Sequence, residues 1–261
     1  METIILIILS ILPVFLIGLY IRFSDKNKEP AGLIIKLFLG GLGAIVVTTI
    51  LTLIISMFYP DILEVTEMSF DYTELFFISF FAIGLVEEFS KWIFVYSISF
   101  NNKHFDETFD MIVYAVFVSL GFACIENIMY VLQGGIKIAL LRSVLSVPGH
   151  ACFGVYMGYY LLKTKMCTLR GDKKNKNINM FKSIIIPMLL HGAFDFLVFC
   201  NTGIAFFILV VLVIILYVFV IIIIVRESKS SLKFKYKYNF CGICGRRVDS
   251  RFCPICGSKN E

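Results

Sequence analysis

Acidic and basic side chains interrupt several of the apolar segments of this sequence. Glu87 and Glu88 are adjacent, and Lys91 follows one helical turn later, within a hydrophobic stretch that runs from about residue 75 to residue 100. An ionisable side chain at the centre of a membrane-spanning helix costs roughly 2.5 to 3.5 kcal/mol on insertion scales. Ionisable residues recur in three other hydrophobic segments: Glu126, His150, His191 and Asp195. This repetition predicts one shared polar site inside a membrane protein.

The residue types at this site suit the hydrolysis of a peptide bond. Glu87 can act as a general base on a water molecule. A histidine, His150 or His191, can hydrogen-bond a developing oxyanion or pass a proton to the leaving amine. Asp195, one turn from His191, can fix the tautomer of that imidazole. No cysteine nucleophile is indicated, because buried cysteines are usually inert and those of the apolar segments are scattered: Cys124, Cys152 and Cys200.

The composition places the chain among membrane proteins. Of its 261 residues, 59% are hydrophobic and 16% are charged, which is too apolar for a soluble domain of this size. The first hydrophobic segment, residues 3–21, follows Met1 and Glu2 without the basic region or cleavage site of a secretory signal, so we expect it to be retained as a helix. The expected fold class is an all-α polytopic membrane protein.

A bundle of about seven transmembrane helices is expected, because each hydrophobic segment is long enough to cross a bilayer. The expected spans are residues 3–21, 31–58, 74–100, 109–133, 138–162, 183–200 and 204–225. Basic residues cluster in the first, third and fifth connections: Arg22, Lys26, Lys28, Lys103, Lys163, Lys165, Arg170, Lys173, Lys174, Lys176 and Lys182. The second connection carries only acidic charges: Asp61, Glu64, Glu67, Asp71 and Glu74. Because basic loops face the cytoplasm, we expect a multi-pass protein of the cell membrane with its N-terminus outside and its C-terminus in the cytoplasm.

The ionisable residues of the spans are expected at similar depth. At about 1.5 Å of rise per residue, counted from the outer end of each span, they lie roughly 9 to 20 Å deep, between the outer leaflet and the bilayer centre. Residues four apart share a helix face, which aligns Glu87 with Lys91 and His191 with Asp195. A helix bundle with these faces turned inward would enclose a polar cavity.

Four short motifs follow one another across the third to sixth hydrophobic segments. They are Glu87-Glu88-x-x-Lys91, Phe122-x-x-x-Glu126-Asn127-x-x-Tyr130, His150 followed by Gly154-x-x-x-Gly158, and His191-x-x-x-Asp195. In this order they resemble the motif set of the PrsW family of intramembrane proteases, which is similar to the CAAX prenyl endopeptidases and their bacterial relatives. The resemblance implies that Glu87 and Glu88 are the essential acidic pair. It also implies that Glu126 and His191 complete the site, with His150 as a further member.

The same resemblance has implications for the oxyanion role and for the substrate. The CAAX enzymes usually carry histidine in the second motif and often asparagine in the third, where this chain has Glu126 and Asp195. Their oxyanion role is therefore not transferred to these two residues. The implied substrate is a single-span membrane protein embedded in the lipid bilayer, such as a membrane-bound anti-sigma factor that is cut on its extracytoplasmic side.

Other interpretations of the polar site are a structural ion-pair network and a transporter or sensor. Glu87 with Lys91, or Glu126 with a histidine, could neutralise each other and hold the bundle together. Chains of Glu, His and Asp also carry protons or bind ligands in transporters. Transporters often show internal repeats, and none is evident between the two halves of this sequence. The adjacent Glu87 and Glu88, and the spacing of His191 and Asp195, favour the hydrolase interpretation over these two.

A catalytic metal ion is left open by the sequence. His150 and His191, with either Glu126 or Asp195, could supply three ligands to zinc and leave Glu87 as the base. The chain lacks the His-Glu-x-x-His spacing that makes such an assignment specific. The catalytic type is therefore either glutamic or metal-dependent.

The C-terminal tail forms a separate unit in this interpretation. Residues 1–226 are expected to form the transmembrane protease domain and residues 227–240 a basic and aromatic linker. Residues 241–261 are expected to form a small cytoplasmic zinc ribbon, because they contain two Cys-x-x-Cys pairs: Cys241, Cys244, Cys253 and Cys256. Two disulfides are the alternative, which a reducing cytoplasm disfavours. The four sulfur ligands close the shell of this zinc ion, so it would be structural. A cytoplasmic protein is a candidate partner of the ribbon, and nucleic acid is not expected to bind.

Overall fold

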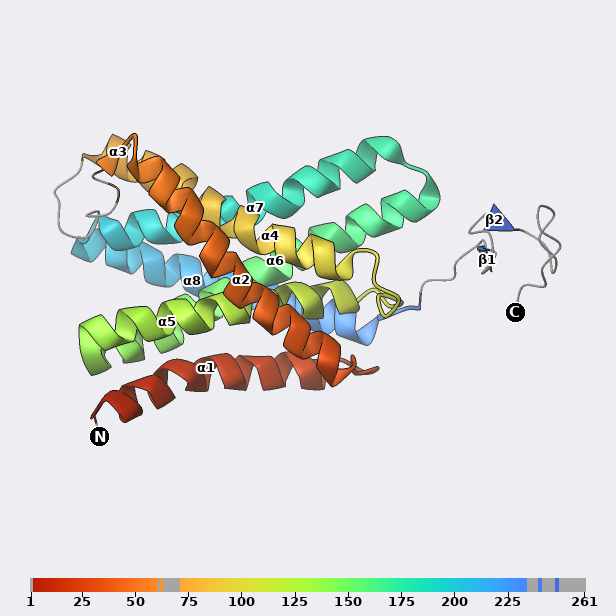
Figure 1. Ribbon diagram of the computed structural model, residues 1–261, viewed down its shortest axis with the longest axis horizontal. Helices are drawn as coiled ribbons and strands as arrows, with labels where there is room; N and C mark the ends of the chain where they lie inside the picture. Colours follow the sequence, from red (N-terminus) through yellow and green to blue (C-terminus); the bar gives the residue numbers. More distant parts are fainter. Residues whose placement is uncertain (1, 61, 63–70, 234–238, 241–246, 249–261) are drawn as a thin grey trace.

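The structure is a computed structural model that describes residues 2–60, 62, 71–233, 239–240 and 247–248. Most of the described chain is helical, and the long helices run side by side in a bundle (Figure 1). The helices are α1 (Glu2–Ser24), α2 (Ala31–Ser56), α3 (Tyr72–Phe77), the π-helix η2 (Ile78–Leu85), α4 (Val86–Ser99), α5 (Asp110–Val144), α6 (Ser146–Arg170), α7 (Lys173–Phe199) and α8 (Gly203–Lys229). Two short strands, β1 (Asn239–Phe240) and β2 (Arg247–Val248), pair antiparallel near the C-terminus. The expected zinc ligands Cys241, Cys244, Cys253 and Cys256 lie outside the described residues.

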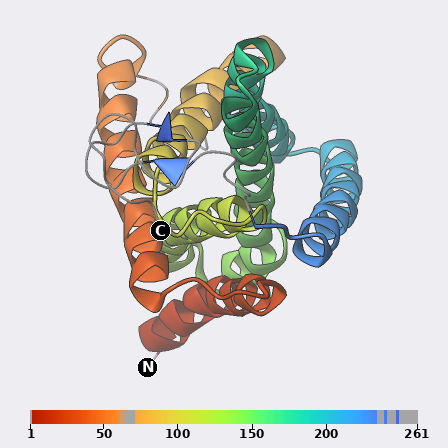
Figure 2. The same ribbon diagram turned by 90° about the vertical axis from the view of Figure 1, so that its right-hand side faces the viewer.

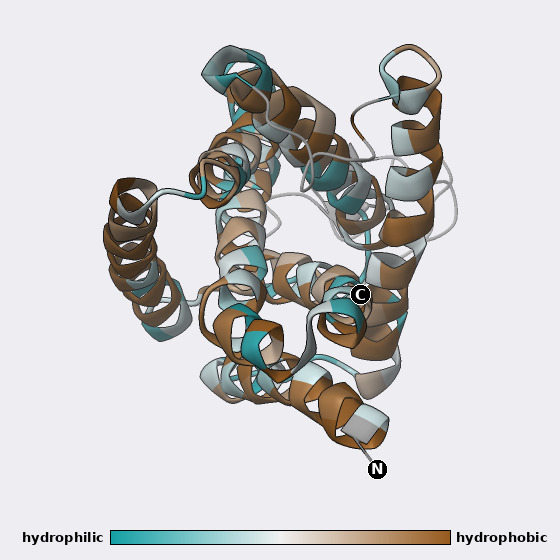
Figure 3. Ribbon diagram, turned by 90° about the vertical axis from the view of Figure 1, so that its left-hand side faces the viewer, coloured by the Kyte–Doolittle hydropathy of each residue, from teal (hydrophilic) through white to brown (hydrophobic). Residues whose placement is uncertain are grey.

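The described helices have the lengths and surfaces of membrane-spanning elements. Five helical stretches are long and apolar enough to cross a membrane: Thr3–Ser24, Ala31–Ser56, Asp110–Arg170, Lys173–Phe199 and Gly203–Lys229. The third of these stretches comprises both α5 and α6, and α3, η2 and α4 follow one another without a break as a further helical rod. Large hydrophobic side chains cover the outward faces, most completely on α8 (Figure 3). The predicted class, a polytopic helical membrane protein, is confirmed.

Helix α5 forms the core of the bundle. It packs against α1, α2, α4 and α6, and the first part of α5 is buried on every side (Figure 2). A helix that is apolar all round belongs in such a position. Close packing against α2 depends on two glycines, because a Cβ atom on Gly121 would lie 2.0 Å from the carbonyl oxygen of Phe38, and one on Gly41 would lie 2.1 Å from that of Val118. The two backbones are therefore in direct contact.

The expected boundaries of the fifth span are wrong. Residues 138–162 were expected to form one helix, but this range is divided at Leu145, because α5 ends at Val144 and α6 begins at Ser146. The turn in the expected connection before this range is made by Gly135, where φ is 67° and ψ is −160°. This backbone conformation is essentially restricted to glycine. Residues 136–144 form a short helical segment after the turn, which we call the return segment, and α6 begins only at Ser146. A hydropathy window does not detect the break at Leu145, because the sequence is largely apolar on both sides of it.

The expected basic loop between the fifth and sixth spans is also shorter than the sequence suggested. Helix α6 continues to Arg170 and α7 already begins at Lys173, so most of the lysines expected in a loop lie on helices. The turn between the helices is set by Gly171, with a φ of 76°, and by Asp172, whose side chain accepts a hydrogen bond from the backbone N–H of Asn175. Lysine has a high helix propensity although it is polar, so a hydropathy window underestimated the length of both helices.

Buried carboxylates gather where the α1–α2 and α4–α5 connections meet. Asp25, Glu29 and Glu107 are all at most 5% exposed. The chain after α8 docks beside them: the Ser231 hydroxyl donates to Glu107 at 3.0 Å, and Lys233 forms a backbone bridge with Glu107. These contacts fix the start of the linker against the helical body.

Replacing Glu29 with glutamine is expected to reduce the pH dependence of stability. Burial, with the nearby carboxylates adding to its effect, raises the pKa of Glu29 to about 7. Unfolding lowers this pKa to its ordinary value, so proton binding favours the folded chain at low pH and this stabilisation is lost as the pH rises through about 7. The apparent Tm of the purified protein in detergent should therefore fall from pH 5 to pH 8 by less in Glu29→Gln than in the wild type. The exposed Glu74→Gln variant is the control, and equal falls in the wild type and Glu29→Gln would contradict the prediction.

Candidate active site

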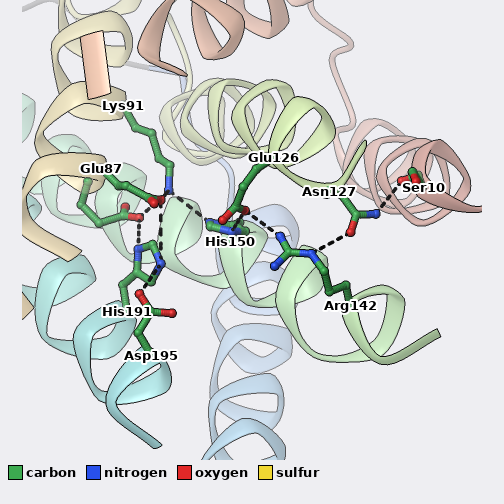
Figure 4. A network of polar contacts seen from close by, with 10 residues as sticks. Ser10, Glu87, Lys91, Glu126, Asn127, Arg142, His150, His191 and Asp195 are labelled. Carbon is green, nitrogen blue, oxygen red and sulfur yellow. Dashed lines mark hydrogen bonds and ion pairs between the residues drawn. The ribbon is translucent and has the colours of Figure 1, made fainter. Parts of the chain in front are cut away.

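A cavity of about 960 Å³ opens among the helices. Its walls come from α3, η2, α4, α5, α6, α7 and α8 and are mostly apolar. The predicted site residues that line it are Glu87, Glu126, His150, His191 and Asp195. Glu88, also predicted, lies directly behind them with 0% of its surface exposed. The structure thus brings all the predicted site residues of the spans into one connected polar network (Figure 4).

The glutamate pair is positioned by an unusual stretch of helix. Glu87 and Glu88 lie in the first turn of α4, directly after η2, whose wide π-helical turns are often found at functional sites. η2 packs against α7 through small residues, because a Cβ atom on Gly192 would lie 2.8 Å from the Cα atom of Phe80. This contact brings His191 of α7 next to the glutamates of α4.

Lys91 is the cation at the centre of the network. Its Nζ atom lies 2.7 Å from Glu88 Oε1 and 3.3 Å from Glu87 Oε2. It also lies 3.1 Å from His150 Nδ1 and 4.0 Å from the ring centroid of Phe122. The Lys91 and Glu88 side chains are both fully buried, so each depends on the other for charge compensation.

His191 is held by carboxylates on both sides of its ring. Its Nδ1 atom lies 2.9 Å from Glu88 Oε1, and its Nε2 atom lies 3.3 Å from Asp195 Oδ2 and 3.8 Å from Glu87 Oε2. The ring stacks on Phe153 with 4.9 Å between centroids. Glu88 therefore joins Lys91 to His191, and the Nε2 atom of His191 faces the cavity side of the site.

His150 has a separate carboxylate partner on α5. Its Nε2 atom lies 2.7 Å from Glu126 Oε2, and the same oxygen accepts a hydrogen bond from Arg142 Nη2 at 2.8 Å. Because α6 begins at Ser146, His150 lies about one turn from the start of its helix. The expected depth of His150, which was counted along one helix from the outer end of the fifth span, is therefore wrong. Its place beside Glu126 does not depend on that count.

Arg142 is a site residue that the motif analysis missed. It lies on the return segment and contacts Glu126 and Asn127 of α5. The sequence held a signal, since Arg142 is the only lysine or arginine between residues 138 and 162. A lone arginine in an apolar segment is by default a functional-site candidate.

The residues fit a divalent metal ion. Ligand atoms of Glu87, His150 and His191 all lie within 4.8 Å of one another, and all three side chains are buried. Two histidines and a carboxylate are the donor set of many catalytic zinc sites, and each histidine here has a further carboxylate on its other nitrogen, as metal-binding histidines usually do. The Oε2 atom of Glu88 is also buried without a hydrogen-bond partner. The third ligand in this group is Glu87, whereas the sequence analysis considered Glu126 or Asp195.

Comparisons with known proteins agree with this geometry. Residues 29–224 match the model of a family described as PrsW family intramembrane metalloprotease. The Protease PrsW of Oceanobacillus iheyensis is 39% identical over 188 residues, which cover 72% of this chain and 80% of the relative. The Protease PrsW of Clostridioides difficile is 36% identical over 211 residues, or 79% of this chain and 84% of the relative. That of Bacillus subtilis is 35% identical over 179 residues, or 68% and 75%. No solved structure matches the chain.

The match extends well beyond the glutamate and histidine motifs. The matched residues, 29–224, begin just before α2 and end within the last turns of α8, so they include every element that lines the cavity. A transporter or a purely structural network is disfavoured by this match to a protease family. The chain belongs to the PrsW family of intramembrane proteases.

Proposed function

We propose that the two adjacent glutamates of this protease have different roles. Glu87 activates the water molecule as a general base, and Glu88 positions Lys91 and His191. The observation that carries the proposal is the difference in their surroundings. Glu87 lines the cavity and is 9% exposed, whereas Glu88 is 0% exposed and is engaged by Lys91 and His191. Of these two adjacent glutamates, only Glu87 can meet a water molecule that enters the cavity.

The proposed reaction is hydrolysis of a peptide bond with Glu87 as the proton carrier. Glu87 accepts a proton from the water as its oxygen attacks the peptide carbonyl carbon, and gives it to the amine nitrogen when the C–N bond breaks. His150 and His191 would hold a divalent metal ion beside Glu87, and when bound it would acidify the water and polarise the carbonyl. Asp195 keeps the His191 ring in place from the cavity side, at 3.3 Å.

The proposed substrate is a membrane-anchored protein, and a single-span anti-sigma factor is the class that the motif resemblance implies. Apolar residues such as Phe194, Leu197 and Phe206 line the cavity and suit a hydrophobic stretch of substrate chain. The lining includes the start of α3 and the α7–α8 connection, which lie at the end of the bundle opposite the α6–α7 turn (Figure 1). With the basic connections in the cytoplasm and the N-terminus outside, the site would face the extracytoplasmic half of the bilayer.

The proposal is tested by cleavage of tagged single-span membrane proteins in proteoliposomes. We expect a defined product by mass spectrometry, loss of that product when a chelator removes divalent metal, and its return when zinc is added back. His191→Ala should also abolish the product. The matched control is His104→Ala, because His104 is the histidine outside the cavity lining. A product that survives both chelation and His191→Ala would overturn the proposed site.

A further inference from the structure

We infer that Arg142 is a positioning residue of the active site, which acts through Glu126 to orient His150. The inference rests on the proposed role of His150 and extends it to a residue of the return segment. The guanidinium is linked to His150 through a shared carboxylate oxygen. Its Nη2 atom lies 2.8 Å from Glu126 Oε2, the oxygen that also lies 2.7 Å from His150 Nε2.

The position of Arg142 is fixed from several directions. Its Nε atom donates to Asn127 Oδ1 at 2.9 Å (Figure 4). Its guanidinium carbon lies 4.2 Å from the ring centroid of Tyr130. The Asn127 amide nitrogen donates to the backbone carbonyl of Ser10 at 2.9 Å, which leaves the amide oxygen turned toward Arg142. A residue of α1 thus determines which end of Asn127 receives the guanidinium.

The return segment that carries Arg142 is held at both ends. At its start, the turn at Gly135 directs the segment back along α5. At its end, the Tyr217 hydroxyl of α8 lies 2.5 Å from the carbonyl oxygen of Val144 and 3.2 Å from that of Leu145. The arginine is therefore placed by the fold and does not depend on a flexible surface contact.

The hydrogen-bond donors and acceptors around His150 determine its tautomer. Glu126, ionised in its pair with Arg142, can only accept, so His150 must donate through Nε2. The Nδ1 atom then carries the lone pair, and it lies 3.1 Å from the Lys91 ammonium donor. Arg142 thereby selects the tautomer of His150 that carries its proton on Nε2 and its lone pair on Nδ1, the nitrogen on the Lys91 side of the ring. Carboxylates that fix a histidine in this way typically change metal affinity or activity by roughly 10- to 100-fold when the contact is lost.

Arg142→Gln is the direct test, with Lys137→Gln as the matched control. Lys137 lies exposed on the same segment, so the control removes the same charge without touching Glu126. We expect Arg142→Gln to lower kcat by roughly 10- to 100-fold with little change in KM, and to weaken zinc binding, measured by competition with a chromophoric chelator, by a similar factor. Lys137→Gln should change neither quantity. Equal values for the two variants would overturn the inference.

A double-mutant cycle separates positioning from general damage to the fold. If Arg142 acts through Glu126, the variant with both Glu126→Gln and Arg142→Gln should lose no more activity than Glu126→Gln alone. Losses that multiply would overturn the inference. Arg142→Lys keeps the positive charge and should restore part of the zinc affinity, which also covers the case in which Arg142→Gln does not fold.

A His150→Ala variant distinguishes this inference from the proposed function. If His150→Ala loses activity and zinc affinity while Arg142→Gln keeps both, only the positioning role is wrong. If His150→Ala keeps both, the proposed role of His150 is wrong, and the inference is wrong with it.

Discussion

Glu87→Gln is expected to lower the rate of peptide cleavage by roughly 10²- to 10⁴-fold, the usual contribution of a general base, while the helical bundle stays folded. Glutamine keeps the size of the side chain and loses the ability to accept a proton. Lys91 keeps its closer partner, Glu88, at 2.7 Å. The measurement is the single-turnover cleavage rate in proteoliposomes, together with the apparent Tm in detergent.

Glu88→Gln is the matched variant, because it makes the same chemical change one residue away. It removes the closest carboxylate from the fully buried Lys91 and also the partner of His191 Nδ1. Breaking a buried ion pair from one side costs roughly 3 to 5 kcal/mol, so this variant should lower the Tm as well as the cleavage rate. A stable Glu88→Gln variant beside an unstable Glu87→Gln variant would reverse the proposed assignment of the two glutamates.

Gly121→Ala is expected to lower the stability of the protein strongly. The added Cβ atom would lie 2.0 Å from the carbonyl oxygen of Phe38, and a backbone atom cannot rotate away as a side chain can. Helix α2 must then move from α5, and the cost should reach or exceed about 3 kcal/mol, the upper part of the range for overpacked cores. The displacement also reaches Glu126 of the same helix, so cleavage should fall with stability.

The control for this substitution is Gly32→Ala in α2, where a Cβ atom would meet nothing within 4 Å. Alanine favours a helix over glycine by about 1 kcal/mol, so Gly32→Ala should leave the protein as stable as the wild type or more so. Apparent Tm values in detergent compare the two variants. If Gly121→Ala unfolds at the temperature of the wild type, the backbone contact between α2 and α5 is not as close as the structure indicates.

The residues that form the site could be predicted well, because each of them stands out within its own segment of the sequence. An ionisable residue in an apolar segment is costly wherever the helix packs, so Glu87, Glu126 and His191 were identified from one chain alone. The spacing of His191 and Asp195 also placed both on one helix face, and the structure has them 3.3 Å apart. The zinc ribbon remains a prediction from its cysteine spacing.

The pairing of these residues could not be predicted, because it depends on which helices are neighbours. Adjacent glutamates look equivalent in the sequence, yet α7 places His191 against Glu88 while Glu87 faces the cavity. The carboxylate partner of His150 is on α5, and Glu126 in turn is held by Arg142 from the return segment. Each of these contacts joins elements that are distant along the chain.

The sequence by itself determined the class of the protein, the helices that carry the site and the identity of the polar residues, since hydropathy and the cost of buried charge act on each segment separately. The tertiary structure decided the break at Leu145 between the return segment and α6, the place of Arg142 and the division between a glutamate in the cavity and one behind it. The turn at Gly135 directs the segment that carries Arg142 back along α5, and the close approach of α7 to η2 places His191 beside the glutamates. Neither feature changes the average hydrophobicity of a segment, so both can be identified only from the tertiary structure.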